Sequence, residues 1–154
     1  MDDRETPGIV APPPLIVAGV LTLGLLLDRA APGPAPRARI RKTAGPLAIG
    51  AGLALGTSAF AAIARAGTPM NPYAPTKALV TSGPFAVSRN PIYVGMIAVY
   101  LGVALRARSL TALALLPVAL GLLERGVIDR EERYLERRFS DAYRAYRERT
   151  PRWL

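Results

Sequence analysis

Residues 43–64 decide the fold, and they read TAGPLAIGAGLALGTSAFAAIA without a single charged side chain. An α-helix rises about 1.5 Å per residue and the hydrocarbon core of a bilayer is about 30 Å thick, so this run is long enough to cross it. Gly52 and Gly56 lie four residues apart, a spacing that lets two helices approach closely in lipid. The run therefore predicts a transmembrane helix that packs tightly against a neighbour.

Three further uncharged runs extend this pattern, at residues 9–27, 91–105 and 109–123. The first is preceded by acids and interrupted by prolines, which does not fit a cleaved signal peptide. The last two are separated by a short Arg-Ala-Arg sequence and are typical of an antiparallel hairpin whose arginines reach the interface. We expect one integral-membrane all-α domain over residues 1–154. It would be a multi-pass bundle of about four transmembrane helices with a C-terminal interfacial amphipathic helix.

Composition excludes several classes of function. The chain has no Cys and no His, which excludes disulfides, a Cys/His metal site, a Cys nucleophile and an imidazole base. The formal charge is +9, yet the C-terminal arginines alternate with acids and form no clean basic stripe. A basic surface facing anionic lipid explains this charge better than a nucleic-acid site does. We therefore expect neither a metal nor a nucleic acid as a partner, but membrane lipids.

The distribution of Lys and Arg predicts the orientation. With four spans, the N-terminus, the loop at residues 65–89 and the C-terminal segment share one side, and this side carries most of the basic residues. The positive-inside rule then makes it the cytoplasmic side. The basic cluster at residues 37–42 favours the opposite orientation.

A helix start at Asn90 and Pro91 is the first candidate functional feature. Asn is a favourable N-cap residue and Pro a favourable first helical residue. One interpretation is a plain helix cap. The other is that free N–H groups at the positive end of the helix, next to Arg89, hold a carboxylate or a phosphate.

The second feature is a carboxylate on an otherwise apolar helix face. A stripe with a spacing of four runs through the C-terminal segment, and Glu131 is its one charged member. Glu131 is either solvated or paired with an Arg, or it awaits a cationic ligand. Aromatic and arginine residues from Tyr143 to Trp153 are typical of an interfacial anchor. The stripe consists of Val127, Glu131, Leu135, Phe139 and Tyr143.

Together these motifs resemble a known family, the isoprenylcysteine carboxyl methyltransferases. They are integral-membrane enzymes that use S-adenosylmethionine and are related to the phospholipid N-methyltransferases. The resemblance covers residues 70–151, about half of the chain. It depends on the order and spacing of Gly83-Pro84-Phe85, Arg89-Asn90-Pro91-Ile92-Tyr93, Glu131-Glu132, Phe139, Tyr143, Tyr146 and Arg149-Thr150-Pro151.

The resemblance implies a site for S-adenosylmethionine built from the loop, the helix start and the C-terminal helix. Glu131 would meet the ammonium group and the helix start the carboxylate, while Phe85 or Tyr93 suits adenine or the sulfonium. Methyl transfer needs alignment and desolvation more than an acid, a base or a metal, so a chain without His and Cys can perform it. The implied cofactor-binding residues are Lys77, Ala78, Leu79, Val80, Phe85, Arg89, Asn90, Pro91, Ile92, Tyr93 and Glu131.

Three departures from the family bear on the methyl acceptor. Asn90 and Phe85 replace a His and a Tyr that are common in the family, and Val127 replaces an Arg associated with the substrate carboxylate. We expect Val127 to border the cofactor pocket on the lipid side, where it offers no partner to a carboxylate. A lipophilic acceptor with an amine, thiol or hydroxyl is therefore favoured over a prenylcysteine carboxylate.

Two other functions remain open from the sequence. One is an NADPH-dependent enzyme similar to the steroid reductases, and the other is a catalytically silent membrane scaffold or transporter accessory subunit. A broad basic cluster for the 2′-phosphate would favour the former. The latter predicts no cofactor binding, and the spans contain no charges that would give a transporter an ion path.

Overall fold

A computed structural model describes residues 7–31, 38–69 and 74–154, and the side chains of residues 38–41 are not described. Within this part of the chain every regular element is a helix, as predicted. The start of the predicted cofactor-binding half, residues 70–73, lies outside the described residues. The helices are α1 (Pro13–Ala30), α2 (Ala38–Arg65), the 3₁₀ turn η1 (Gly83–Ala86), α3 (Pro91–Ala107), α4 (Leu110–Ala114), α5 (Leu116–Leu123), the π-helical turn η2 (Glu124–Ile128) and α6 (Asp129–Arg149).

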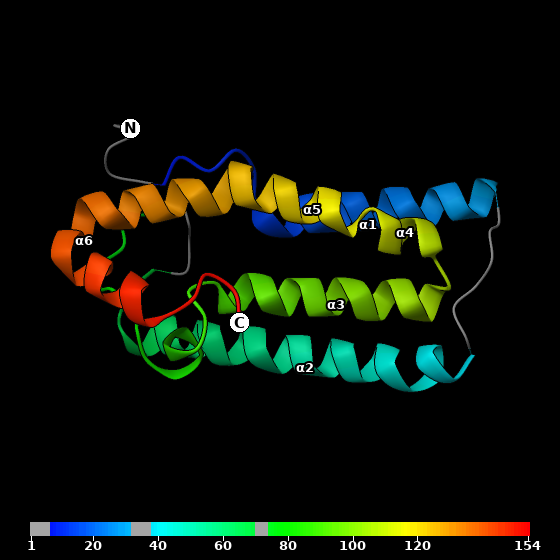
Figure 1. Ribbon diagram of the computed structural model, residues 1–154, viewed down its shortest axis with the longest axis horizontal. Coiled ribbons are helices and arrows are strands. Elements are labelled where there is room, and N and C mark those ends of the chain that lie inside the picture. The colour runs from blue at the N-terminus through cyan, green and yellow to red at the C-terminus, as the bar shows by residue number, and fades with distance from the viewer. Residues whose placement is uncertain (1–6, 32–37, 70–73) are drawn as a thin grey trace.

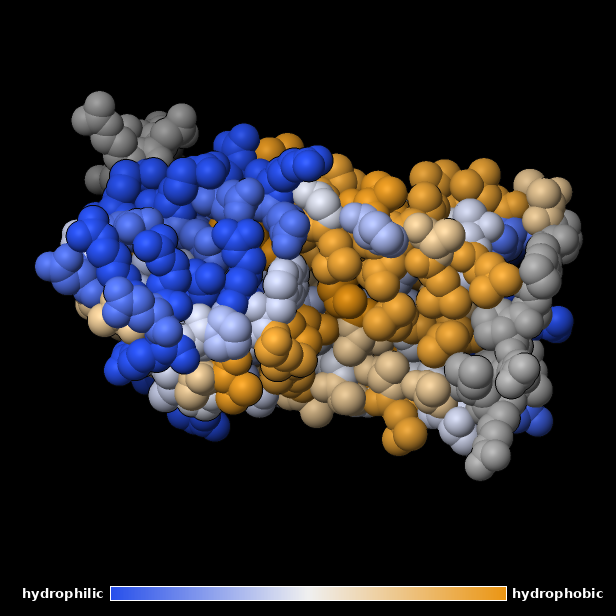
Figure 2. All heavy atoms as spheres, viewed as in Figure 1, coloured by the Kyte–Doolittle hydropathy of each residue, from blue (hydrophilic) through white to orange (hydrophobic). Residues whose placement is uncertain are grey.

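Among the described residues, two helices are long and apolar enough to cross a membrane. They are α1 and the part of α2 from Lys42 to Arg65, with mean hydropathies of 1.5 and 1.8. Helix α3 is also apolar but has 17 residues. The helices run along the long axis of the molecule, and apolar side chains cover one half while a polar surface covers α6 (Figures 1 and 2). The fold and the family reported below place the chain in a membrane.

The predicted span at residues 109–123 is not one continuous helix. It is divided into α4 and α5 at Leu115, two residues before Pro117. Proline lacks an N–H and its ring crowds the carbonyl four residues earlier, so the helix restarts with Pro117 in its first turn. Ser109 caps α4 by accepting a hydrogen bond from the N–H of Ala112 at 3.0 Å. The division therefore has a local cause in the sequence.

Glycines bring α2 and α3 into backbone contact. A Cβ added to Gly52 would lie 2.5 Å from the carbonyl oxygen of Gly95, and one added to Gly102 would lie 2.6 Å from that of Gly45. Helices in lipid gain little from the hydrophobic effect and associate through close packing, so small residues at the contact favour the pair. The predicted tight contact at Gly52 is present.

The residues before α1 form an N-terminal strap, defined here as residues 7–12. The N–H of Val10 donates to the carbonyl of Gly126 in η2 at 3.1 Å, and Arg130 donates to the carbonyl of Gly8 at 3.0 Å. Ile9 is buried in the core beside α5 and η2. The strap is therefore attached to the start of α6, while α1 packs against α3, α4 and α5.

Helix α6 is bent and its aromatic face is covered by protein. Ser140 has a φ of 43°, a value that few non-glycine residues adopt, and the helix bends there. Tyr134, Tyr143 and Tyr146 are all buried. The prediction of an interfacial anchor is therefore wrong for Tyr143 and Tyr146, because these rings pack against the chain itself rather than against lipid headgroups.

Candidate functional site

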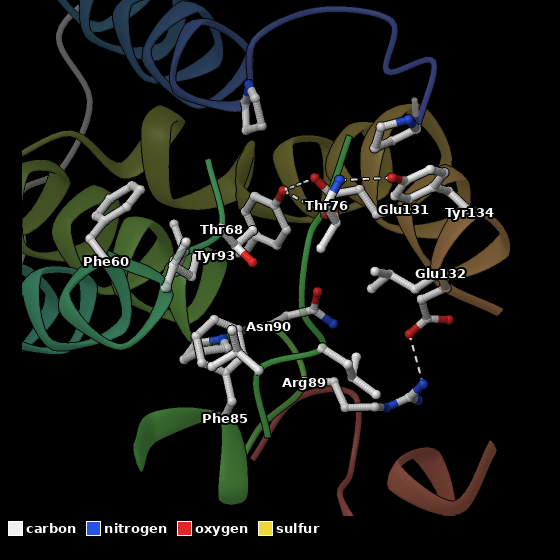
Figure 3. A pocket seen from close by; sticks show the side chains of 18 of the residues that line it. Phe60, Thr68, Thr76, Phe85, Arg89, Asn90, Tyr93, Glu131, Glu132 and Tyr134 are labelled. Atoms are coloured by element: carbon white, nitrogen blue, oxygen red, sulfur yellow. Dashed lines mark hydrogen bonds and ion pairs between the residues drawn. The ribbon is translucent and has the colours of Figure 1, made fainter. Parts of the chain in front are cut away.

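A cavity of about 430 Å³ is lined both by polar residues of α6 and by apolar residues of α1, α2 and α3. Its volume is within the roughly 300–1,000 Å³ typical of sites for small molecules. In Figure 3, Arg89 and Glu132 lie on one side and Phe60 on the other, with Tyr93 and Glu131 also facing the cavity. The walls come from the N-terminal strap, the start of α1, the end of α2, residues 68–69 and 74–90 of the loop, the start of α3 and α6.

Tyrosines of α6 hold the loop in place over the cavity. The hydroxyl of Tyr134 accepts a hydrogen bond from the N–H of Thr76 at 2.8 Å, and the hydroxyl of Tyr146 donates to the carbonyl of Phe85 at 2.7 Å (Figure 3 shows the former). Burial raises the pKa of Tyr146 to about 12, with the nearby Tyr143 adding to the effect, so this hydroxyl stays a donor at neutral pH. The aromatic residues near the C-terminus thus position the site.

The start of α3 leaves N–H groups open to the cavity. Asn90 occupies the predicted N-cap position, but its side chain makes no capping bond and instead donates to the carbonyl of Arg152 at 3.0 Å. Pro91 has no N–H, and those of Ile92 and Tyr93 have no acceptor among the described residues. The positive end of the helix is therefore free to meet an anion, and the interpretation as a plain cap does not fit.

Arg89 places a second donor at the same point. Its guanidinium pairs with Glu132 at 2.9 Å and donates to the hydroxyl of Tyr143 at 3.4 Å, and its side chain is only 11% exposed. Within the described part of the chain, its Nε is buried and has no acceptor. A buried donor without a partner costs free energy, so a ligand oxygen at this position would be favoured.

Glu131 supplies a carboxylate without a cation. Both of its oxygens lie 2.8 Å from the hydroxyl of Tyr93 (Figure 3), and it has no ion pair among the described residues. Burial raises the pKa of Glu131 to about 7, the bond from Tyr93 lowers it, and the charge of Glu132 raises it further. A cationic group bound here would relieve the cost of the buried charge.

Glu132 also faces the cavity, which sequence reasoning missed. The helical spacing that puts Glu131 on the apolar stripe puts Glu132 on another face of the helix. Glu132 pairs instead with Arg89 and with Arg152, which follows the end of α6. The partners are far away in sequence, so no helical spacing could have revealed them.

Most of the predicted site residues meet at the cavity. Asn90 and Pro91 line it with Arg89 and Glu131, and six other residues of the predicted set also line it. Lys77 is exposed and is not part of the lining, because Thr76 and Ala78 on either side of it face inward. The six are Ala78, Leu79, Val80, Phe85, Ile92 and Tyr93.

The prediction that Val127 borders the cavity is wrong. Val127 is 0% exposed and belongs to the apolar core with Ile9, Leu123 and Ile128. The cause is the π-helical turn η2, which breaks the spacing of four before α6, and the strap, which covers this turn. Residues that the sequence did not indicate line the cavity instead, among them Phe60, Ile63, Met96 and Pro12–Pro14.

A helical bundle whose polar and apolar parts share one cavity is suited to an integral-membrane protein that handles a partly apolar small molecule. Over residues 40–142 the chain matches the model of the phospholipid methyltransferase family, and it belongs to that family. The resemblance found in the sequence is thus confirmed. The matched region runs from α2 to α6 and contains the helix start, Arg89 and Glu131.

Two curated relatives match part of the chain. One is the cobalt-zinc-cadmium resistance protein CzcN of Cupriavidus metallidurans, 38% identical over 47% of this chain and 33% of the relative. The other is the nickel-cobalt-cadmium resistance protein NccN of Alcaligenes xylosoxydans xylosoxydans, 36% identical over 47% of this chain and 34% of the relative. The matched part spans about a third of the length of each. No solved structure matches.

Proposed function

We propose that the protein is a multi-pass membrane methyltransferase that transfers a methyl group from S-adenosylmethionine to a lipophilic acceptor. Four crossings would be made by α1, α2, α3 and the α4–α5 pair, with the cavity on the cytoplasmic face. One observation carries the proposal: a single cavity joins unpaired donors and an unpaired carboxylate to an apolar wall at the membrane end.

The polar end of the cavity fits the charged groups of S-adenosylmethionine. Its carboxylate would meet the Nε of Arg89 and the open N–H groups of Ile92 and Tyr93, and its ammonium would meet Glu131. Phe85 and Tyr93 would provide aromatic surface for adenine or the sulfonium. Each of these residues lines the cavity, and the Nε of Arg89 and the N–H groups of Ile92 and Tyr93 lack a partner within the described chain.

When bound, S-adenosylmethionine supplies an electrophilic methyl group on a cationic sulfur. The chain has to hold the donor, align the acceptor behind that carbon and exclude water. Tyr134 and Tyr146 hold the loop closed over the polar end, and Glu132 keeps the guanidinium of Arg89 in place. A neutral thioether leaves, so no acid is needed.

The apolar end of the cavity supports a lipophilic acceptor. It is lined by Phe60, Ile63, Met96 and prolines of the strap and α1, without a charged side chain among them. Among the described residues that line the cavity, Arg89 is the one cation, and it is already paired with Glu132. A carboxylate at the apolar end would therefore lack a partner, which favours an amine, thiol or hydroxyl.

The other functions have less support. An NADPH enzyme would need several cations for the 2′-phosphate, whereas the part of the lining that the structure describes contains a single, paired arginine. A silent scaffold gives no reason for an unpaired buried donor. The metal-resistance role in the relatives' names is not carried over, because the described residues contain no group of three or more potential metal ligands.

The test is transfer of labelled methyl groups from S-adenosylmethionine to three acceptors: an amine phospholipid, a small lipophilic thiol and a farnesylcysteine analogue. We expect transfer to the amine or the thiol. Phe60→Ala should raise the acceptor KM several-fold with unchanged affinity for S-adenosylhomocysteine, whereas Leu53→Ala, exposed on the same helix, should change neither. Saturable esterification of the farnesylcysteine analogue would overturn the choice of acceptor, and absence of any transfer would overturn the proposed reaction.

A further inference from the structure

A second hollow of about 200 Å³ lies beside the N-terminal strap, outside the first cavity. It is lined by Pro7 and Gly8 of the strap and by Arg130, Arg133 and Arg137 of α6. Arginines three and four residues apart lie on the same helix face. Arg130 also donates to the carbonyl of Gly8 at 3.0 Å, so the strap holds one guanidinium at the rim. Pro7 lines both cavities.

The acids of α6 do not neutralise these arginines. Asp129 pairs with Arg152, and Glu136 pairs with Arg144 and Arg147. Glu131 and Glu132 face the methyl-transfer cavity. Within the described part of the chain, Arg133 and Arg137 therefore have no acidic partner, and no acid lines the hollow. Like charges this close repel one another unless an anion lies between them.

The arginines of the hollow follow, along the chain, the point at which the strap brings apolar surface to η2. Val10 is 68% exposed and is held beside Gly126, so apolar surface reaches this point of the molecule. Arg130, Arg133 and Arg137 follow Gly126 by about one, two and three helical turns, or about 6, 10 and 16 Å at 1.5 Å per residue. The headgroup region is about 5–8 Å thick on each side of the hydrocarbon, so Arg130 falls within it and the two other arginines lie on its aqueous side. The polar surface over α6 also begins where the apolar surface ends (Figure 2).

We propose that this hollow binds the phosphate group of an anionic phospholipid from the surrounding leaflet. Guanidinium groups match phosphate oxygens with paired hydrogen bonds, and three of them converge here. The lipid is bound as a structural ligand, separate from the methyl acceptor. It bridges α6 and the strap.

The test compares the melting temperature of the protein in nanodiscs of phosphatidylcholine with and without phosphatidylglycerol. Phosphatidylglycerol should raise the melting temperature of the wild type. The double variant R133Q/R137Q should lose more than half of this rise. The control R125Q/R149Q removes the same charge from exposed positions outside the hollow and should keep the rise. Where the double variant does not fold, R137Q alone should lose part of the rise.

Three results would overturn the proposal. Equal losses in the double variant and its control would indicate a general basic surface. Inorganic phosphate that reproduces the rise in phosphatidylcholine nanodiscs would indicate a site for free anions. A rise seen only after neutralising Asp2, Asp3 and Glu5, which precede Pro7 in sequence, would show that the chain's own carboxylates fill the hollow. Titration with S-adenosylhomocysteine should give the same affinity in R133Q/R137Q as in the wild type, so this test is independent of the proposed reaction.

Discussion

The α2–α3 pair and the polar cap are stabilised by different kinds of interaction. We define the polar cap as residues 74–90, α6 and residues 150–154. In the α2–α3 pair, glycines such as Gly52 and Gly95 let backbones touch, and shape decides the contact. In the polar cap, tyrosine hydroxyls bond to backbone groups and arginines pair with Glu132. The α2–α3 contact depends on glycines, which have no side chain, whereas the polar cap depends on the polar groups of its side chains.

This difference explains where the site is built. Lipid offers no polar partners, so the apolar half gains its order from packing and gives the cavity an inert wall. The polar cap can leave selected groups unpaired, as at the Nε of Arg89 and the carboxylate of Glu131, because neighbouring bonds hold them in position. The α2–α3 pair thus shapes the apolar wall of the cavity, and the polar cap provides the groups that can bind a ligand.

The largest expected effect breaks the α2–α3 contact. In Gly52→Ala the new Cβ would lie 2.5 Å from the carbonyl oxygen of Gly95, which should destabilise the protein by about 3 kcal/mol. Gly50→Ala, on the same helix with nothing within 4 Å, should stabilise it by about 0.5–1 kcal/mol through helix propensity. Thermal unfolding in detergent measures both. Equal effects would show that the close contact does not stabilise the pair.

The second effect concerns how the free energy of unfolding depends on pH through Glu131 of the polar cap. The pKa of Glu131 rises from 4.5 to about 7 on folding, so its protonated form favours the folded state. This contribution is fully present below about pH 4.5 and is lost as the pH rises through about 7. Glu131→Gln should remove it and change the free energy of unfolding between these pH values by about 1–3 kcal/mol relative to the wild type. Glu148→Gln, an exposed acid of the same helix, should follow the wild-type curve.

A smaller effect compares one tyrosine from each region. Tyr146→Phe loses the bond to Phe85, and Tyr100→Phe loses the bond to the carbonyl of Ala112. Each should cost about 0.5–1.5 kcal/mol of stability. Of the two variants, only Tyr146→Phe should also weaken binding of S-adenosylhomocysteine, because its bond to Phe85 holds the loop at the cavity and the bond of Tyr100 does not. A loss of affinity for S-adenosylhomocysteine in Tyr100→Phe would contradict the view that ligand binding depends on the polar cap and not on the α2–α3 pair.

The smallest effect is expected at Lys77. Its side chain is exposed and lies outside the cavity lining, although the sequence resemblance placed it in the cofactor site. Lys77→Ala should therefore leave the affinity for S-adenosylhomocysteine unchanged within a factor of about two. Calorimetric titration of this variant checks the prediction, and a ten-fold loss would restore the lysine to the site.

The sequence predicted the helices from local patterns, and the resemblance to a known family indicated many of the residues that line the cavity. An uncharged run gives a helix, and the order of Asn90, Pro91 and Glu131 gives the polar end. It failed where partners are distant or the backbone is irregular. Glu132 meets Arg89 from another element, and the turn η2 moves Val127 into the core. Neither a long-range ion pair nor a π-helical turn leaves a periodic signal.

The most direct test of the account is calorimetric titration of S-adenosylhomocysteine into the detergent-purified protein and its Glu131→Gln variant. We expect saturable binding to the wild type. The variant should lose about 1–3 kcal/mol of binding free energy, equivalent to roughly 5- to 150-fold weaker affinity. The exposed-acid variant Glu148→Gln should bind like the wild type. Binding of NADPH in place of S-adenosylhomocysteine, or equal affinities in the wild type and Glu131→Gln, would contradict it.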